Sequence, residues 1–128
     1  MDITVNSKGR AEAQCLRSTT AKEMGSGSIL VYATPSMVAL MENAACNAVA
    51  EALPEEKTTV GIYMEIQHIA ATPVGLDVYA EAQVTEVNGK IITFSVEAFD
   101  EKCQIGKGIH KRCIVDTQRF LDKAYEKI

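Results

Sequence analysis

Apolar side chains recur at every second position after residue 59, and this is the period of a β-strand. The first alternating set is Val60, Ile62, Met64, Ile66 and Ala70, with His68 on the same side; the second is Leu76, Val78, Ala80, Ala82 and Val84; the third is Ile92, Phe94, Val96 and Ala98. The side chains between these positions are mostly polar, so each segment has one face suited to a core and one suited to water. We therefore expect three strands with one apolar face each.

Turn-forming residues separate these strands. Turns are predicted at residues 71–75, at Asn88-Gly89 and near Glu101-Lys102, after which a further strand over 104–116 would return the chain. Because each connection is short, the pattern predicts an antiparallel meander in which neighbours in sequence are neighbours in the sheet.

A helical period precedes the strands. Its apolar positions recur at three and four (Met37, Leu40, Met41, Ala44, Ala48 and Ala52), and Val38, Ala45 and Val49 widen the apolar stripe nearly all the way round. Thr34 is predicted to cap the helix with its hydroxyl, Pro35 suits the first helical position, and Pro54 ends a run of about 19 residues. We expect a mostly buried helix, about 28 Å long.

The two ends of the chain carry weaker patterns. Residues 10–16 could form a strand, residues 19–28 mix glycines and turn formers as a mobile loop or lid would, and residues 117–128 suit a short amphipathic helix. One long buried helix and an antiparallel sheet with one apolar face pack together most simply if the sheet curls around the helix. The sequence therefore predicts an α+β fold with residues 1–128 in a single domain.

Composition excludes several classes of function. The chain has 128 residues and a net charge of −4, so general binding to nucleic acid or to an anionic membrane is not expected. A local basic patch of Lys107, His110, Lys111 and Arg112 could still hold an anionic ligand. The first residues lack an apolar secretory core, which predicts a cytoplasmic protein, and the four cysteines show no metal-ligand spacing, so we expect free thiols and no metal.

Two ionisable residues fall at positions that the patterns assign to the interior. Glu42 lies within the buried helix and His68 on the apolar side of the first strand. An unpaired buried carboxylate is costly, so Glu42 needs a hydrogen-bonded partner or a wet cavity, and His68 could be that partner. Two satisfied core groups, or a glutamate that reaches water past small neighbours, would explain the pattern equally well.

The segments ATPSMVALMENAA, TTVGIYMEIQHIAATPVGLDV, AQVTEVNGKIITFSVEAFDE and IGKGIHKR resemble, in order and spacing, the hotdog-fold acyl-CoA thioesterases of the fluoroacetyl-CoA thioesterase-like type. This resemblance places the family's catalytic threonine, glutamate and histidine on Thr34, Glu42 and His68, its strand arginine on Arg112, and the glycine beside the thioester on Gly61. It also implies a homodimer with its acyl-CoA sites in the interface between subunits, and no cofactor other than the coenzyme A of the substrate.

The implied chemistry is thioester hydrolysis. Glu42 would activate water or attack the thioester itself, Thr34 would position the reacting group at the helix N-terminus, and His68 would orient them and donate to the carbonyl or the leaving sulfur. Gly61 would allow close backbone approach, while Arg112 would anchor the surroundings of Glu42 or a coenzyme A phosphate, unless it is a solvated surface charge.

Substrate identity is less well determined by the sequence. The fluoroacetyl-selective branch has large aromatic residues before the helix, whereas this chain has MGSGSILVYAT there, with Tyr32 as the one nearby aromatic. We therefore do not expect selectivity for fluoroacetyl, but a broad or different preference for a small or medium acyl group on coenzyme A. The alternatives are a hotdog hydratase, which places its catalytic residues differently, and a noncatalytic protein that binds an acyl-CoA or another small ligand.

Overall fold

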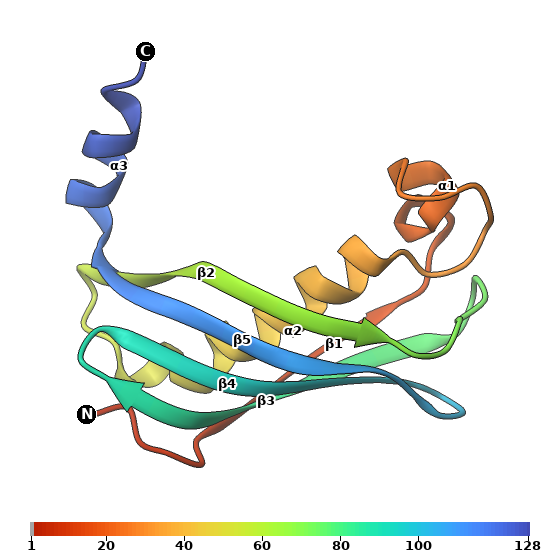
Figure 1. Ribbon diagram of the computed structural model, residues 1–128, viewed down its shortest axis with the longest axis horizontal. Helices are drawn as coiled ribbons and strands as arrows, with labels where there is room; N and C mark the ends of the chain where they lie inside the picture. The colour runs from red at the N-terminus through yellow and green to blue at the C-terminus, as the bar shows by residue number, and fades with distance from the viewer. Residues whose placement is uncertain (1) are drawn as a thin grey trace.

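The computed structural model describes residues 2–128 (Figure 1). Its strands are β1 (Lys8–Gln14), β2 (Lys57–His68), β3 (Asp77–Asn88), β4 (Ile91–Asp100) and β5 (Gln104–Asp116); its helices are α1 (Ala21–Met24), α2 (Thr34–Val49) and α3 (Thr117–Tyr125), with 3-10 turns η1 (Arg17–Thr19) and η2 (Ala50–Ala52). The α+β class is confirmed. The strand predicted in residues 10–16 is present with its bounds shifted to Lys8–Gln14, and the terminal helix is present but ends at Tyr125.

All strand pairs are antiparallel, in the order β1-β3-β4-β5-β2. The meander prediction is correct for β3, β4 and β5 but wrong for β2, which pairs with β5 and lies at the edge of the sheet. The segment after β2 therefore does not form a hairpin with β3 but crosses the end of the sheet. Alternating patterns specify which face of a strand is buried, and they carry no information about which strand lies beside it.

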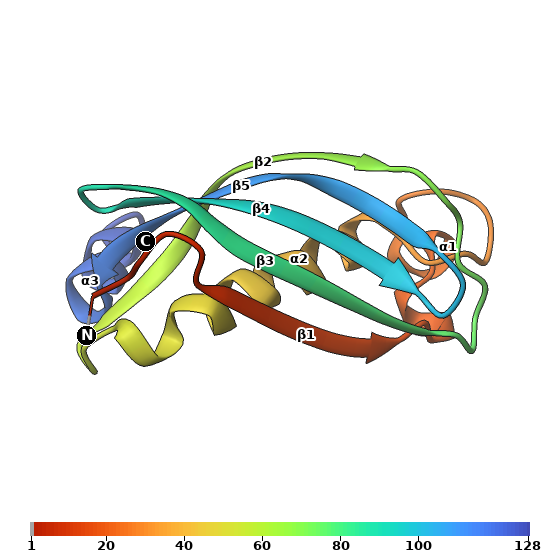
Figure 2. The same cartoon turned by 90° about the horizontal axis from the view of Figure 1, so that it is seen from below.

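The sheet arches over α2, as Figure 2 shows with β1 along its lower border. The apolar faces predicted for β3 and β4 are confirmed, because Val78, Ala80, Ala82, Val84, Ile92, Phe94, Val96 and Ala98 are all buried. Against them α2 buries Met37, Leu40, Met41, Ala44, Ala45 and Val49. The prediction of burial nearly all round α2 is wrong for the single chain, since Pro35, Ala39 and Asn43 remain exposed along one side.

A β-bulge interrupts β2 between Gly61 and Tyr63. The extra residue shifts the alternation by one, so Thr59 is buried before the bulge while Ile62 is 51% exposed. The predicted inner face holds for Met64, Ile66 and His68, which are partly buried, and is wrong for Ile62. Gly61 and His68 are seven residues apart and would lie on opposite faces of a regular strand. The bulge allows both to face the helix.

The remaining connections follow the turn chemistry. Gly89 adopts a positive φ of 62° in the hairpin between β3 and β4, and the carboxylate of Asp100 accepts hydrogen bonds from the backbone of Lys102 and Cys103 in the next turn. The predicted lid folds as η1, α1 and a loop beside the N-terminal end of α2 (Figure 1).

None of the helices in residues 2–128 is long and apolar enough to span a membrane.

Candidate active site

Thr34 and His68 meet at the N-terminal end of α2. The hydroxyl Oγ1 of Thr34 lies 2.8 Å from Nδ1 of His68, at the last residue of β2. The capping prediction for Thr34 is wrong, because Ala33 occupies the N-cap and Thr34 is already the first helical residue. A hydroxyl in the first turn can turn outward to another partner, and here it bonds a residue 34 positions away.

The other ring nitrogen of His68, Nε2, is buried and has no hydrogen-bond partner among residues 2–128. Burial also lowers the pKa of His68 below its usual value of 6.5, so the ring is held neutral near pH 7. A buried polar atom without a partner is costly, and such atoms are concentrated at sites where a ligand supplies the missing bond. Nε2 is therefore an atom available to a bound molecule.

A cleft of about 360 Å³ opens beside this pair. It is lined by Ala21, Ser26, Val31, Tyr32, Thr34, His68, Ile69, Ala70 and Ala71. Its wall thus combines the lid, the start of α2 and the segment after β2. Tyr32 itself is buried, and its hydroxyl donates to the carbonyl of Ser36, so the one aromatic side chain near the helix start is fixed in the wall.

Glu42 lies further along α2, and its partner is Arg112 of β5. Nη1 of Arg112 donates to Oε2 of Glu42 over 3.1 Å, and the Glu42 side chain is 41% exposed. The structure thus brings Glu42 to Arg112 and brings His68 to Thr34, so the expected direct pairing of Glu42 with His68 is wrong within one chain. The expectation that Arg112 anchors Glu42 agrees with this contact.

Arg112 is itself held tightly. Its Nε donates to the hydroxyl of Thr59 over 2.8 Å, and its Nη2 donates to the carbonyl oxygen of Thr59 over 3.0 Å. Arg112 is only 7% exposed, which excludes the solvated-charge interpretation. The predicted basic patch is also wrong, because alternation along β5 points His110 and Arg112 inward and leaves Lys107 exposed on the other face.

Gly61 lies directly against the Glu42 carboxylate. A Cβ atom built on Gly61 would come within 2.6 Å of Oε2 of Glu42 and 3.3 Å of Nη1 of Arg112. The absence of a side chain at this position is therefore what gives the carboxylate its room beside the strand.

His110 is a functional candidate that the sequence analysis assigned only to a surface patch. Its ring is 1% exposed, and Nε2 lies 3.1 Å from Nη1 of Arg112 and 3.9 Å from Oε2 of Glu42. The available signal was its position two residues before Arg112, which places both side chains on the same face of one strand.

These residues form two groups separated along the helix. Thr34 and Glu42 are eight residues apart, which is about 12 Å along the axis of α2. Gly61 and His68 are seven residues apart on β2, roughly 20 Å. One group contains the Thr34 hydroxyl and the neutral imidazole of His68. The other, the Glu42 group, contains the Glu42 carboxylate with Arg112, His110 and Gly61 around it.

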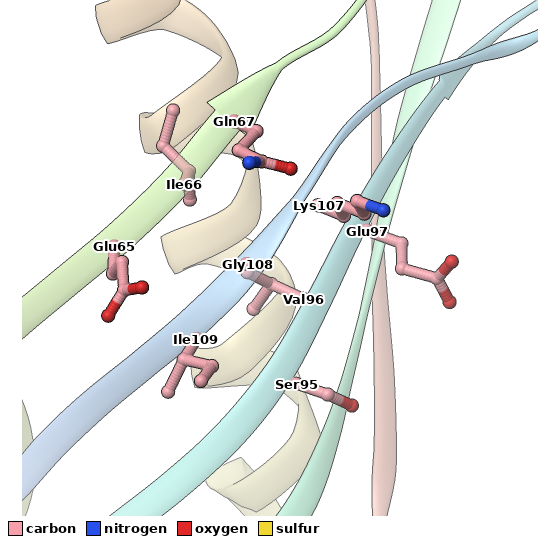
Figure 3. A pocket seen from close by; sticks show the side chains of 9 residues that line it. All are labelled: Glu65, Ile66, Gln67, Ser95, Val96, Glu97, Lys107, Gly108 and Ile109. Carbon is pink, nitrogen blue, oxygen red and sulfur yellow. The ribbon is translucent and has the colours of Figure 1, made fainter.

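A larger depression of about 470 Å³ lies on the outer face of the sheet, across β2, β4 and β5 (Figure 3). Its polar rim includes Glu65, Gln67, Glu97 and Lys107, and Glu97 is the cross-strand neighbour of Lys107. Opposite charges paired across an exposed sheet surface are an ordinary way to stabilise it. Thr34, on the helix that packs under the other face, is not part of its lining.

Residues 2–128 include no cluster of three or more His, Cys, Asp or Glu side chains arranged to hold a metal ion. The side chains of the site supply a hydroxyl, two neutral imidazoles, a carboxylate and a guanidinium.

An antiparallel sheet wrapped around one long helix is the hotdog fold, and the comparisons with known proteins define the class as the hotdog thioesterases. A family model described as fluoroacetyl-CoA-specific thioesterase matches residues 16–118. The fluoroacetyl-CoA thioesterase of Streptantibioticus cattleyicolor is 36% identical over 97 residues, which cover 76% of this chain and 70% of that protein.

Solved structures agree with the sequence match. The structure of the fluoroacetyl-CoA thioesterase FlK superposes with a TM-score of 0.93 at 28% identity, over 100% of this chain and 99% of that one. A mutant of the same enzyme in complex with fluoroacetate and CoA gives a TM-score of 0.86 at 28% identity, over 91% and 98% of the two chains. The chain described here belongs to the fluoroacetyl-CoA-specific thioesterase family.

Proposed function

We propose that this protein hydrolyses acyl-CoA thioesters to the free acid and coenzyme A, and that Thr34, Glu42 and His68 carry out the reaction. The observation that carries the proposal is the 2.8 Å contact between Thr34 and His68, which leaves Nε2 of His68 buried and without a partner beside an open cleft. Family membership supports the reaction type. Coenzyme A would enter as part of the substrate, and the proposed reaction uses no further cofactor.

His68 and Thr34 would bind the thioester. A neutral imidazole can donate to the carbonyl oxygen or to the departing sulfur, and the first backbone N–H groups of α2 favour the negative charge that develops there. The hydroxyl of Thr34 would hold the His68 ring in orientation and contact the reacting group.

Glu42 would supply the attacking group. As a carboxylate it can take a proton from water, or attack the thioester carbon and form an anhydride that water then cleaves. Arg112 fixes Oε2 through a charge-assisted hydrogen bond, while Gly61 leaves space on the strand side for the acyl group.

The separation of the two groups within one chain supports the homodimer that the family resemblance implies. General-base and nucleophilic catalysis require contacts of about 3 Å, whereas Thr34 and Glu42 are about 12 Å apart along the helix. The site would therefore combine Thr34 and His68 of one subunit with the Glu42 group of the other.

The edge of the sheet supports this arrangement. In the part of the chain that the structure describes, β2 pairs on one side only, with β5, so its other edge can pair with a second copy of β2. A two-fold axis midway between Gly61 and His68 would bring each histidine next to the other subunit's carboxylate. The same contact would cover the exposed side of α2 that includes Ala39 and Asn43.

The substrate would carry a small or medium acyl group. Ala21, Ser26, Ala70 and Ala71 give the cleft a wall of small side chains, and the lid contributes glycines and serines rather than large aromatic residues. A wall of this kind accepts acyl groups of different size and gives little selectivity for fluoroacetyl over acetyl.

The test of the function is release of free coenzyme A thiol from a panel of acyl-CoAs, from acetyl through phenylacetyl to long-chain, by the parent protein and Glu42→Gln. We expect turnover by the parent and its loss in the variant, with an unchanged melting temperature. Stabilisation of the parent by acyl-CoA without turnover would instead identify a binding protein.

The test of the shared site is complementation between two inactive variants, Thr34→Ala and Glu42→Gln. A mixed dimer has one site with both substitutions and one site with neither. Unfolding and refolding an equimolar mixture should therefore restore about a quarter of the parent activity. If each chain held a complete site, the mixture would stay as inactive as its components.

A further inference from the structure

His110 occupies the centre of the Glu42 group. It comes from β5, its ring stacks on Phe94 of β4 with centroids 5.9 Å apart, and it is 1% exposed. Two hydrogen-bond contacts fix it: Nδ1 lies 2.8 Å from the carbonyl oxygen of Tyr63 in β2, and Nε2 lies 3.1 Å from Nη1 of Arg112.

These partners determine where the ring proton resides. A backbone carbonyl only accepts, so Nδ1 must carry hydrogen to bond Tyr63. A guanidinium only donates, so Nε2 must present its lone pair to Arg112. A ring with hydrogen on Nδ1 and a lone pair on Nε2 is neutral imidazole in one defined tautomer.

We infer that His110 is a positioning residue for thioester hydrolysis: as the neutral Nδ1–H tautomer it accepts a hydrogen bond from Arg112 and thereby fixes the guanidinium that orients Glu42. The catalytic consequence rests on the proposed function, whereas the tautomer and its contacts do not. His110 is not expected to touch the substrate.

The reason for such a residue lies in the geometry of Arg112. Thr59 holds Nε and Nη2, but Nη1 is shared between Oε2 of Glu42 at 3.1 Å and Nε2 of His110 at 3.1 Å. With His110 as a second acceptor, the Nη1 nitrogen is held on two sides. Without that acceptor, one N–H of Nη1 is left buried without a partner, and Glu42 alone holds this nitrogen.

Protonation of His110 would reverse this arrangement. The imidazolium would place a donor against the Nη1 donor of Arg112, and it would compete for Oε2 of Glu42, which lies 3.9 Å from Nε2. The groups that face the ring are Glu42 from α2, Arg112 from β5, the carbonyl of Tyr63 from β2 and the uncharged ring of Phe94 from β4. Burial and the Arg112 charge both lower the pKa of His110, which maintains the neutral form near pH 7.

Two substitutions separate hydrogen bonding from packing. His110→Gln places an amide oxygen near the position of Nε2 and so retains an acceptor for Arg112, whereas His110→Leu fills the space and removes it. Phe94→Leu is the matched control, because it changes the packing of the ring and leaves both of its hydrogen bonds.

In steady-state kinetics on the best acyl-CoA of the panel, we expect His110→Leu to lower kcat by at least about tenfold with KM nearly unchanged. His110→Gln and Phe94→Leu should stay within about threefold of the parent kcat. In the parent, we expect kcat to fall at acid pH as His110 becomes protonated. In His110→Gln this fall should move to another pH or become smaller, because glutamine does not titrate. A parent-like kcat and pH profile in His110→Leu would overturn the inference.

Nitrogen-15 NMR of the histidine rings provides a readout that does not need turnover. We expect the His110 ring near pH 7 to be neutral with its proton on Nδ1; a proton on Nε2, or an imidazolium, would overturn the inference. If no acyl-CoA were hydrolysed by any of these proteins, the proposed function would fail, and the ring tautomer would still decide whether His110 accepts from Arg112.

Discussion

Thr34 and His68 are 34 residues apart in the chain, yet their side chains meet at 2.8 Å where the start of α2 passes the end of β2. The contact uses the hydroxyl that local sequence assigns to helix capping. Since Ala33 is the N-cap and no side-chain bond caps this end, the helix does not depend on Thr34 for its first turn.

Replacing Thr34 therefore separates function from stability. We expect Thr34→Ala to lower kcat by about a hundredfold or more, because His68 loses the group that orients it, while the free energy of unfolding changes by less than the ~1 kcal/mol typical of a lost cap. Thr34→Ser, which keeps the hydroxyl, should retain most activity. Thiol-release kinetics and urea denaturation measure the two effects, and a large loss of stability with normal kcat would support capping instead.

Gly61→Ala tests the space beside Glu42. The new Cβ would lie 2.6 Å from Oε2, so the carboxylate must move, and we expect kcat to fall by at least about tenfold with a small change in melting temperature. Gly9→Ala is the contrasting variant. There the Cβ would overlap the backbone of Ala44 and Ala48, which should destabilise the fold by about 1–3 kcal/mol because backbone cannot move aside. Equal loss of stability in both variants would argue against a specific role for Gly61.

Arg112→Lys tests the anchor of Glu42. A lysine ammonium cannot reproduce the fork that reaches both atoms of Thr59 and the Glu42 carboxylate, so we expect kcat to fall by about tenfold or more and the melting temperature to fall as well. Lys111→Gln is the control on the same strand, since its ammonium lies over the Tyr63 ring on the outer face. If the control reduced activity as much as Arg112→Lys, charge on β5 in general would be the cause.

The buried His110 and the partly buried His68 predict how stability depends on pH. The pKa values of His68 and His110 are both lowered from 6.5, chiefly because burial disfavours the charged ring. Below about pH 6.5 these two residues therefore bind more protons in the unfolded chain than in the folded one. Their contribution to the free energy of unfolding is complete above that pH and is lost as the pH falls through their pKa values in the folded protein.

Urea unfolding at about pH 7.5 and about pH 5.5 measures this dependence. We expect lower stability at the acid value, and a weaker dependence in the double variant His68→Gln, His110→Gln. Stability that stayed constant or rose over this interval would mean that the rings are not held neutral by the fold.

The local patterns were sufficient for the elements themselves. The apolar spacing from Met37 to Val49 predicts α2, and the alternation from Val78 to Val84 predicts the inner face of β3, because each depends on the residue's own period and on burial against one core. The family resemblance also predicted Thr34 and Glu42 as catalytic candidates. These properties are local, so the sequence contains them directly.

The partners of the site residues depended on the tertiary structure. Which strand lies next to β2, how the bulge at Gly61 shifts its alternation, and whether Glu42 meets His68 or Arg112 are all long-range choices. A sequence period fixes the face that a side chain occupies, but a hydrogen bond needs a partner within about 3 Å, and only the packing of the sheet around α2 brings Arg112 and His110 to Glu42. The sequence by itself therefore supplied Thr34, Glu42 and His68 as candidates, while the addition of His110 and the division of these residues into two groups were decided by the fold.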